Sequence, residues 1–268
     1  MSAVRVGSAA LPPVLSAAVW RRRLPALALC LLLGACAVDR APGETGAAND
    51  AEATLRLAER TEEAGDFATA LQLYQDLQAN DPSRFEVLAG LGRSFAGLAM
   101  HGRAEQAFRA ALAQQPADRD ALYGLGKALY HQDRLAEAEQ AFRQVLAADP
   151  GYLPAYSALG AALDRQGRHA DAQRAYESGL AIDPTNLALL NNLGLSLALS
   201  GEHGRAIGLL KELVNDPSAT PRVRQNLALA YGLAGQFEAA AAISAIDLPE
   251  GEVASNLAFY RLAMESLR

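Results

Sequence analysis

Small and apolar residues recur along the chain with a period of 34 residues. The clearest series consists of leucines, each followed directly by Gly or Ala: Leu57, Leu91, Leu125, Leu159, Leu193 and Leu227. A series of alanines keeps the same period, at Ala70, Ala104, Ala138, Ala172, Ala206 and Ala240. Four prolines are also spaced by 34 residues: Pro82, Pro116, Pro150 and Pro184. Such a period is typical of proteins that stack similar units side by side.

The residue pattern within each unit predicts two helices, A and B, joined by a turn. Ala and Leu, both good helix formers, dominate the apolar residues, whereas β-branched and aromatic residues are scarce. The small residue after the Leu lets helix A pack closely against helix B. A bulky residue four positions after the Ala, such as Phe108 or Tyr176, fills the space between units. Proline disfavours helix at the residue before it, so helix B ends there. We expect the A–B turns to use glycines with positive φ, namely Gly65, Gly102, Gly167, Gly201 and Gly235.

The predicted repeats occupy residues 51–84, 85–118, 119–152, 153–186, 187–220 and 221–250. Residues 251–268 predict a final helix that starts near Glu252 and covers the apolar face of the last repeat. Its inward side chains are expected to be Val253, Leu257, Tyr260 and Leu262. The predicted fold is therefore all-α, a right-handed α-solenoid of about six helix–turn–helix repeats of 34 residues with a C-terminal capping helix.

The Leu-Gly pairs and the Ala and Phe or Tyr of helix B resemble the tetratricopeptide repeat, which has this same period. The resemblance implies a concave surface lined by the A helices. The family's surface positions carry over to the following residues, which we expect to form a protein-binding groove: Tyr123, Lys127, Tyr130, Asn191, Asn192, Leu195, Arg222, Gln225 and Asn226.

Two interpretations are open for the polar residues of this set. Asn192, Asn226 and Asn256 each precede a leucine in consecutive units. An amide donates and accepts hydrogen bonds, so the row could pair with the backbone of an extended peptide, or each Asn could bridge neighbouring helices. Tyr123 and Tyr130 leave a similar choice between a binding hot spot and packing between repeats.

The N-terminal segment predicts export and lipidation. Arg21, Arg22 and Arg23 precede an apolar stretch of about ten residues, followed by Leu33-Gly34-Ala35-Cys36. This sequence resembles a bacterial lipobox, which implies cleavage of a signal peptide at residues 1–35 and a covalent lipid on Cys36. Residues 36–50 are expected to form a flexible tether. Residue 37 is Ala, not the Asp that commonly retains such proteins in the inner membrane, so the resemblance places the chain at the periplasmic face of the outer membrane, held by its lipid anchor.

Charge and motifs exclude several other functions. Residues 36–268 carry 20 basic and 30 acidic side chains, and such an acidic surface repels nucleic acid. The chain has no phosphate-binding glycine loop and no catalytic or zinc motif. Three of its histidines, His101, His169 and His203, fall at one point of the repeat, where successive turns are too far apart to share a metal. We expect no enzyme activity, no catalytic residue, no metal site, no small-molecule substrate and no cofactor besides the lipid on Cys36.

The C-terminal third is similar to the end of the tight-adherence (Flp-type) pilus assembly lipoproteins. The similar segments are residues 221–230, 235–240, 247–249 and 256–261. This resemblance implies a scaffold that helps a secretin or other pilus components to assemble. The alternatives are an adaptor for another envelope machine, such as a type IV pilus, a secretin pilotin or a polysaccharide exporter, and a regulatory subunit of a cell-wall enzyme.

Overall fold

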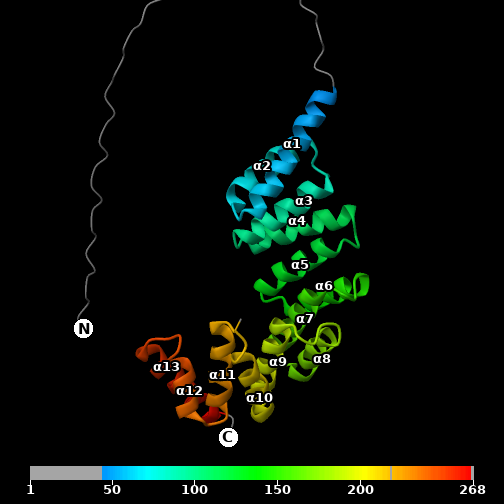
Figure 1. Ribbon diagram of the computed structural model, residues 1–268. Helices are drawn as coiled ribbons and strands as arrows, with labels where there is room; N and C mark the ends of the chain where they lie inside the picture. Colours follow the sequence, from blue (N-terminus) through cyan, green and yellow to red (C-terminus); the bar gives the residue numbers. More distant parts are fainter. Residues whose placement is uncertain (1–43, 218, 267–268) are drawn as a thin grey trace, which may run out of the picture. The chain divides into compact units, whose positions relative to one another are not determined.

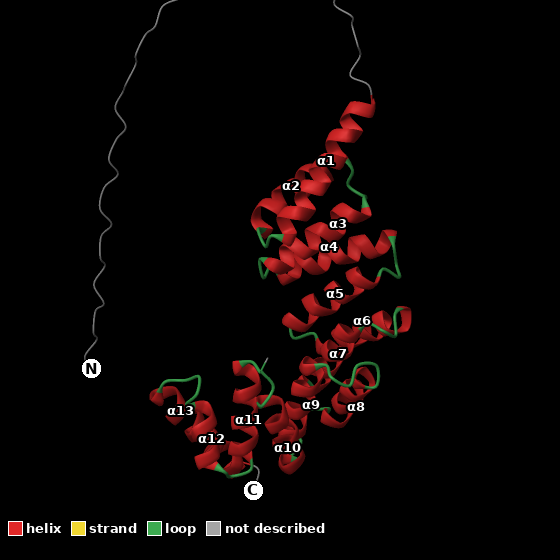
Figure 2. Cartoon of the chain, viewed as in Figure 1, coloured by secondary structure: helices red, strands yellow, loops and turns green. Residues whose placement is uncertain are grey.

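The computed structural model describes residues 44–217 and 219–266, so the predicted signal peptide and Cys36 lie outside the described residues. Within these ranges the chain forms 13 α-helices and no strand (Figures 1 and 2). The odd-numbered helices are α1 (Glu44–Glu63), α3 (Phe85–Gly97), α5 (Arg119–His131), α7 (Leu153–Arg165), α9 (Leu187–Leu199), α11 (Pro221–Leu233) and α13 (Glu250–Ser266). The even-numbered helices are α2 (Phe67–Asn80), α4 (His101–Gln114), α6 (Leu135–Ala148), α8 (His169–Leu180), α10 (His203–Val214) and α12 (Phe237–Ser244).

The helices stack in chain order, each against the next, from α1 to α13. Each odd-numbered helix also packs against the next odd-numbered helix, whereas the even-numbered helices of the described chain do not pack on one another and are linked through long side chains such as Arg109 and Glu137. The odd-numbered helices are therefore closer together and line the inner side of the stack. This arrangement of helix pairs confirms the predicted α-solenoid, with the A helices inside and the B helices outside.

In the first five repeats, one bulky side chain from helix B fills the space between repeats. Phe108 of α4 is buried between Gly92 of its own repeat and Gly124 of the next repeat. A Cβ atom built on either glycine would lie 2.7 Å and 2.4 Å, respectively, from the Phe108 ring. Only glycine allows this approach, so the Leu-Gly pairs of the repeats mark the points where bulky side chains of helix B meet helix A backbones.

The leucine series shows how the first repeat differs from the others. Leu91, Leu125, Leu159, Leu193 and Leu227 are all buried, but Leu57 is 46% exposed. No described helix precedes α1, so the outer face of this helix has no earlier repeat against it. Leu55 and Ala58 of the same helix face α2 and are buried instead.

The first helix begins earlier than the sequence predicts. It starts at Glu44, so residues 44–50, which were assigned to a flexible tether, are helical. The sequence permits this, because no proline occurs between Glu44 and Pro82. Any tether between Cys36 and the helical domain is therefore limited to the residues before Glu44.

The C-terminal helix covers the last repeat with one face only. Val253 and Tyr260 are buried, and Tyr260 packs so closely on Gly232 of α11 that a Cβ there would lie 2.2 Å from its ring. The expectation that Leu262 also points inward is wrong, because this side chain is 65% exposed. Leu262 follows Tyr260 by two residues, a rotation of about 200° around a helix of 3.6 residues per turn.

The turns between A and B helices share one left-handed residue per repeat. Its φ is +82° at Gly65, +72° at Gly167, +88° at Gly201 and +77° at Gly235. In the second and third repeats the same position is occupied by Ala99 and Asp133, with φ of 56° and 62°. The assignment of Gly102 to this turn is therefore wrong. Gly102 lies three residues later, in the first turn of α4.

Replacing Ala99 with glycine is expected to raise the free energy of unfolding by about 0.5–1 kcal/mol, because glycine adopts positive φ without the clash that a Cβ creates. The matched control is Gly167→Ala, which makes the opposite change at the same repeat position and is expected to destabilise by a similar amount. Thermal denaturation followed by circular dichroism measures both. A lower melting temperature for the Ala99→Gly variant would contradict the left-handed turn at this position.

Candidate functional site

A groove of about 1190 Å³ runs along the inner side of the repeats, lined mainly by residues of the odd-numbered helices α5, α7, α9 and α11, with Phe142 of α6 and Tyr176 of α8. Eight of the nine residues expected in a groove contribute to its lining: Tyr123, Lys127, Tyr130, Asn191, Asn192, Leu195, Arg222 and Asn226. The ninth, Gln225, is absent from this lining, and its amide nitrogen lies 3.5 Å from a carboxylate oxygen of Asp247. That carboxylate lies between α12 and α13, so Gln225 faces the C-terminal cap.

Tyr123 combines packing with exposure to the groove. Its ring meets the Tyr152 ring edge-on, with centroids 5.3 Å apart, and lies 5.8 Å from the Phe142 ring. Burial raises the pKa of the Tyr123 hydroxyl above its ordinary value. The ammonium group of Lys127, one helical turn later, lies 5.7 Å from the Tyr123 ring, within the range of a cation–π contact. The two residues form one wall of the groove on α5.

Tyr130 positions a second cation at the groove. The guanidinium of Arg165 lies over the Tyr130 ring, 4.7 Å from its centroid. Arg165 also donates hydrogen bonds to the Tyr130 backbone carbonyl at 3.1 Å and to the Asp133 carboxylate at 2.8 Å. These contacts join the end of α5 to the end of α7 and fix where the guanidinium lies. Sequence patterns did not single out Arg165, since its repeat position carries no comparable charge in the neighbouring repeats.

The asparagines of the groove bridge successive A helices. Asn192 of α9 donates a hydrogen bond of 2.9 Å to the Ser157 hydroxyl on α7. Asn226 of α11 donates one of 2.9 Å to the side-chain carbonyl of Asn191, which is itself buried. The Asn191 amide nitrogen lies 3.5 Å from the Asn192 oxygen. These contacts fit the second interpretation of the row, in which the amides tie neighbouring helices together.

Asp164 lies at the floor of the groove and is the one carboxylate in its lining. It accepts hydrogen bonds from the Tyr176 hydroxyl at 2.9 Å and the Ser196 hydroxyl at 2.7 Å. The His169 Nδ1 atom lies 2.8 Å from the same carboxylate. Burial, together with the nearby Asp164 charge, raises the pKa of Tyr176. The carboxylate is thus fully engaged by the protein.

Asp164 was missed by the sequence reasoning, although the repeat register contains a signal for it. Glu62 stands at the same position in the first repeat and accepts a hydrogen bond of 2.9 Å from Tyr74. In both repeats an acidic residue late in helix A accompanies a tyrosine in helix B. The two repeats with Phe in helix B carry Ala96 and Tyr130 there instead. A tyrosine hydroxyl that is buried needs a partner, and the acid supplies it.

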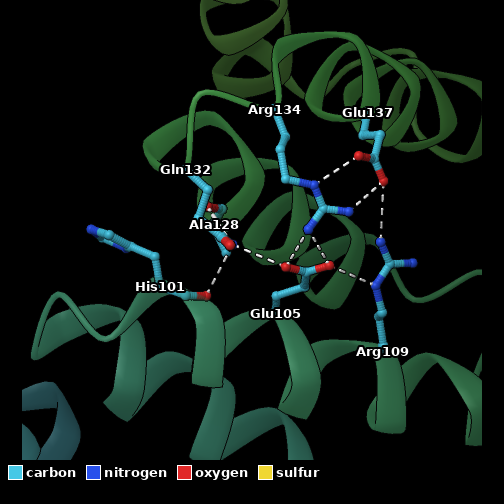
Figure 3. Close-up of polar contacts among 7 residues, drawn as sticks. All are labelled: His101, Glu105, Arg109, Ala128, Gln132, Arg134 and Glu137. Atoms are coloured by element: carbon cyan, nitrogen blue, oxygen red, sulfur yellow. Dashed lines mark hydrogen bonds and ion pairs between the residues drawn. The ribbon is translucent and has the colours of Figure 1, made fainter.

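The outer helices are joined by a second polar cluster, centred on Glu105 of α4 (Figure 3). The Glu105 side chain is only 12% exposed, and its carboxylate accepts hydrogen bonds from Arg134 at 2.6 Å, Gln132 at 3.0 Å and Arg109 at 3.0 Å. Arg134 also pairs with Glu137 at 2.6 Å. Burial alone would raise the pKa of Glu105, but these hydrogen bonds outweigh it and hold the pKa below its usual value.

The same cluster recurs one repeat later, around Glu139 of α6. Its carboxylate binds Arg168 at 2.7 Å, Gln166 at 3.2 Å and Arg143 at 2.9 Å. In the first repeat junction the positions that correspond to Glu139, Gln166 and Arg168 are apolar, with Leu71, Leu98 and Met100. The polar clusters therefore join the second, third and fourth repeats, the part of the chain where the groove begins.

The histidines of the A–B junctions are the first residues of α4, α8 and α10. The His101 ring stacks on His131 of α5, with centroids 4.5 Å apart. Burial, with added repulsion from His101, Lys127 and Arg165, lowers the pKa of His131. Within residues 44–266, as far as they are described, no three His, Cys, Asp or Glu side chains gather in a way that could hold a metal. None of the described helices is long and apolar enough to cross a bilayer.

The fold and the groove define a helical-repeat scaffold with a preformed concave surface. A tetratricopeptide repeat family model matches residues 89–152 and 157–220, so these parts of the chain are similar to tetratricopeptide repeats. No curated protein matches the chain. Such repeats bind protein partners, and they are typically non-enzymatic scaffolds.

Solved structures of similar fold support this class. A tetratricopeptide repeat protein from Parabacteroides merdae is 15% identical, with a TM-score of 0.64 over 81% of this chain and 87% of its own. PilF from Pseudomonas aeruginosa is 19% identical, with a TM-score of 0.61 over 74% and 90%. At these identities the likeness shows the fold alone. A MamA protein is 26% identical, with a TM-score of 0.54 over 58% of this chain and 91% of its own.

Proposed function

We propose that the protein is a lipid-anchored scaffold of the bacterial outer membrane that assists assembly of the tight-adherence pilus by binding a protein segment in its groove. The observation that carries this proposal is the groove itself, which joins four successive A helices and holds eight of the expected residues. The lipobox-like sequence at Cys36 and the likeness of the C-terminal third to the pilus assembly lipoproteins support the location and the machine.

The groove is held open by contacts between its own helices. The amide bridges from Ser157 to Asn192 and from Asn191 to Asn226 fix α7, α9 and α11 against one another. The Glu105 and Glu139 clusters join the outer helices of the preceding repeats. A binding surface that is ordered beforehand loses little conformational entropy when a partner arrives, so more of the contact energy appears as affinity.

The anchor keeps the scaffold close to the membrane. Seven residues lie between Cys36 and the start of α1, and the eight steps from Cys36 to Glu44, at about 3.5 Å each, span no more than about 28 Å even when fully extended. The lipid therefore restricts the groove to partners at the membrane surface, such as a secretin assembling there. Confinement of this kind raises the effective concentration of the scaffold around its partner.

Replacing Cys36 with alanine is expected to release the protein from membranes, because only the thiol can carry the lipid. Membrane fractionation with metabolic labelling by a radioactive fatty acid measures the change. Protein that remained labelled and membrane-bound after this substitution would contradict the anchor.

For the function, crosslinking in cells followed by mass spectrometry should recover a secretin or a pilus subunit from the outer membrane. Recovery of a cell-wall enzyme instead would contradict the pilus role and leave the scaffold.

A further inference from the structure

The charge of the groove is opposite to that of the whole protein. The chain carries a net charge of −6, whereas the groove lining contains Lys127, Arg165 and Arg222 and only one carboxylate, Asp164. That carboxylate is occupied by Tyr176, Ser196 and His169. The groove therefore presents free positive charge inside an otherwise acidic molecule. A ligand of negative charge is attracted to the groove and repelled by the rest of the surface.

Two of the three cations are available to a ligand. Among the described residues, no carboxylate lies within 4.0 Å of Lys127 or Arg222, and both side chains are exposed. Arg165, by contrast, is already paired with Asp133. A partner carboxylate that meets Lys127 or Arg222 breaks no existing ion pair, so the loss of such a pair does not offset its contribution to binding.

The two available cations lie at opposite ends of the groove. Lys127 belongs to α5 and Arg222 to α11, the first and the last helices of the lining. Three helix-to-helix steps separate them, or roughly 25 Å at 8–10 Å per step, which an extended peptide covers with about eight residues.

Apolar side chains lie between these ends. Ala158 and Ala161 of α7 and Leu195 of α9 contribute to the wall, and Leu199 at the end of α9 is 46% exposed there. Because small alanines leave room beside the leucines, this part of the groove suits a large apolar side chain of a ligand.

From this arrangement we propose that the groove takes an extended acidic peptide segment, about eight residues long, with carboxylates near its two ends and a large apolar side chain between them. The proposal rests on the proposed function, since it names the chemistry of the segment that the scaffold binds. The end carboxylates pair with Lys127 and Arg222, and the apolar side chain packs on Ala161 and Leu199.

The test is a selection of random dodecapeptides, displayed on phage, on the full-length protein purified in detergent. Peptides with acidic ends and an apolar centre are expected to be enriched. The selected consensus peptide should bind about tenfold more weakly to the Lys127→Gln, Arg222→Gln double variant, since two exposed ion pairs are lost. Binding of this peptide to the original protein should also weaken as the salt concentration rises. The matched control is Arg60→Gln with Lys211→Gln, which removes the same charge from α1 and α10, outside the groove. This control should bind as tightly as the original protein.

The outcomes separate the two proposals. Enrichment of neutral or basic peptides, with binding abolished by Ala161→Arg, would overturn the acidic ligand and leave the groove as a binding site. If no enriched peptide lost its binding to the Ala161→Arg variant, the groove function would be overturned as well. Two further measurements test other occupants of the groove: binding to vesicles with 30% phosphatidylglycerol, and self-association in sedimentation equilibrium. If the double variant lost either of these while it still bound the peptide as tightly as the original protein, the acidic-peptide inference would also be overturned. Circular dichroism of each variant excludes unfolding as the cause.

Discussion

Replacing Gly126 with valine is expected to lower the free energy of unfolding by about 3 kcal/mol. A Cβ atom at this position would lie 2.5 Å from Cε1 of Phe142, far inside a normal van der Waals contact. The Phe142 ring is buried in the main hydrophobic cluster, so it cannot make room for the new side chain without disturbing its neighbours. Overpacking of this kind forces side chains off their rotamers or shifts the backbone. Valine also has no strong helix propensity to offset the strain.

The matched control is a glycine of the same fold with open space around it. Gly208 lies in α10, and an added Cβ there would meet nothing within 4 Å. Alanine at this position is expected to stabilise the protein by about 0.5–1 kcal/mol, since it restricts the unfolded chain and favours helix. Urea denaturation followed by circular dichroism compares the two variants.

Hydrogen exchange gives the Gly126→Val prediction a local readout. In a solenoid, each repeat contacts only its neighbours, so the loss of protection should centre on α5 and α6 and decline away from them. If the valine variant unfolded at the same urea concentration as the original protein, the close contact between α5 and Phe142 would be wrong.

The repeat framework could be predicted because packing constrains it in every unit. The residue after each leucine of the 34-residue series must be small to admit the bulky side chain of helix B. Gly92, Gly126 and Gly160 show this, because each lies against such a side chain. The turns are less constrained. A position with positive φ favours glycine but tolerates Ala99 and Asp133. Gly102 was chosen because it is a glycine, although it does not lie at the repeat position of the other turn residues. The spacing of 37 residues between Gly65 and Gly102 already departs from the period.

The groove could be located from the sequence, but the partners of its polar residues could not. Helix A positions follow from the period, which is why Tyr123 and Asn226 are both in the lining. Which amide bonds which neighbour depends on the offset between adjacent helices. Ser157 meets Asn192, and Asn191 meets Asn226, at separations of 35 residues instead of 34. Neither composition nor motifs reveal this one-residue shift between the partners of successive repeats. The shift determines that the asparagines bond to the neighbouring helices.

Replacing Asp164 with alanine is expected to lower the free energy of unfolding by about 3 kcal/mol, because it leaves several donors without a partner. The Asp164 side chain is only 12% exposed, and its carboxylate accepts the hydroxyls of Tyr176 and Ser196. Both of those residues are buried, so water replaces the lost acceptor poorly. An unsatisfied buried donor costs about 1–3 kcal/mol.

Two further variants distinguish this explanation from a simple loss of packing. Tyr176→Phe and Ser196→Ala each remove one donor and leave the carboxylate with its other partners, so each is expected to cost about 1 kcal/mol. Combining both with Asp164→Ala should then add little further loss, since the donors that lacked a partner are gone. Denaturation of the full set of variants measures the coupling. If the three effects simply added, the Asp164 carboxylate would not be the common acceptor that holds α7, α8 and α9 together at the groove floor.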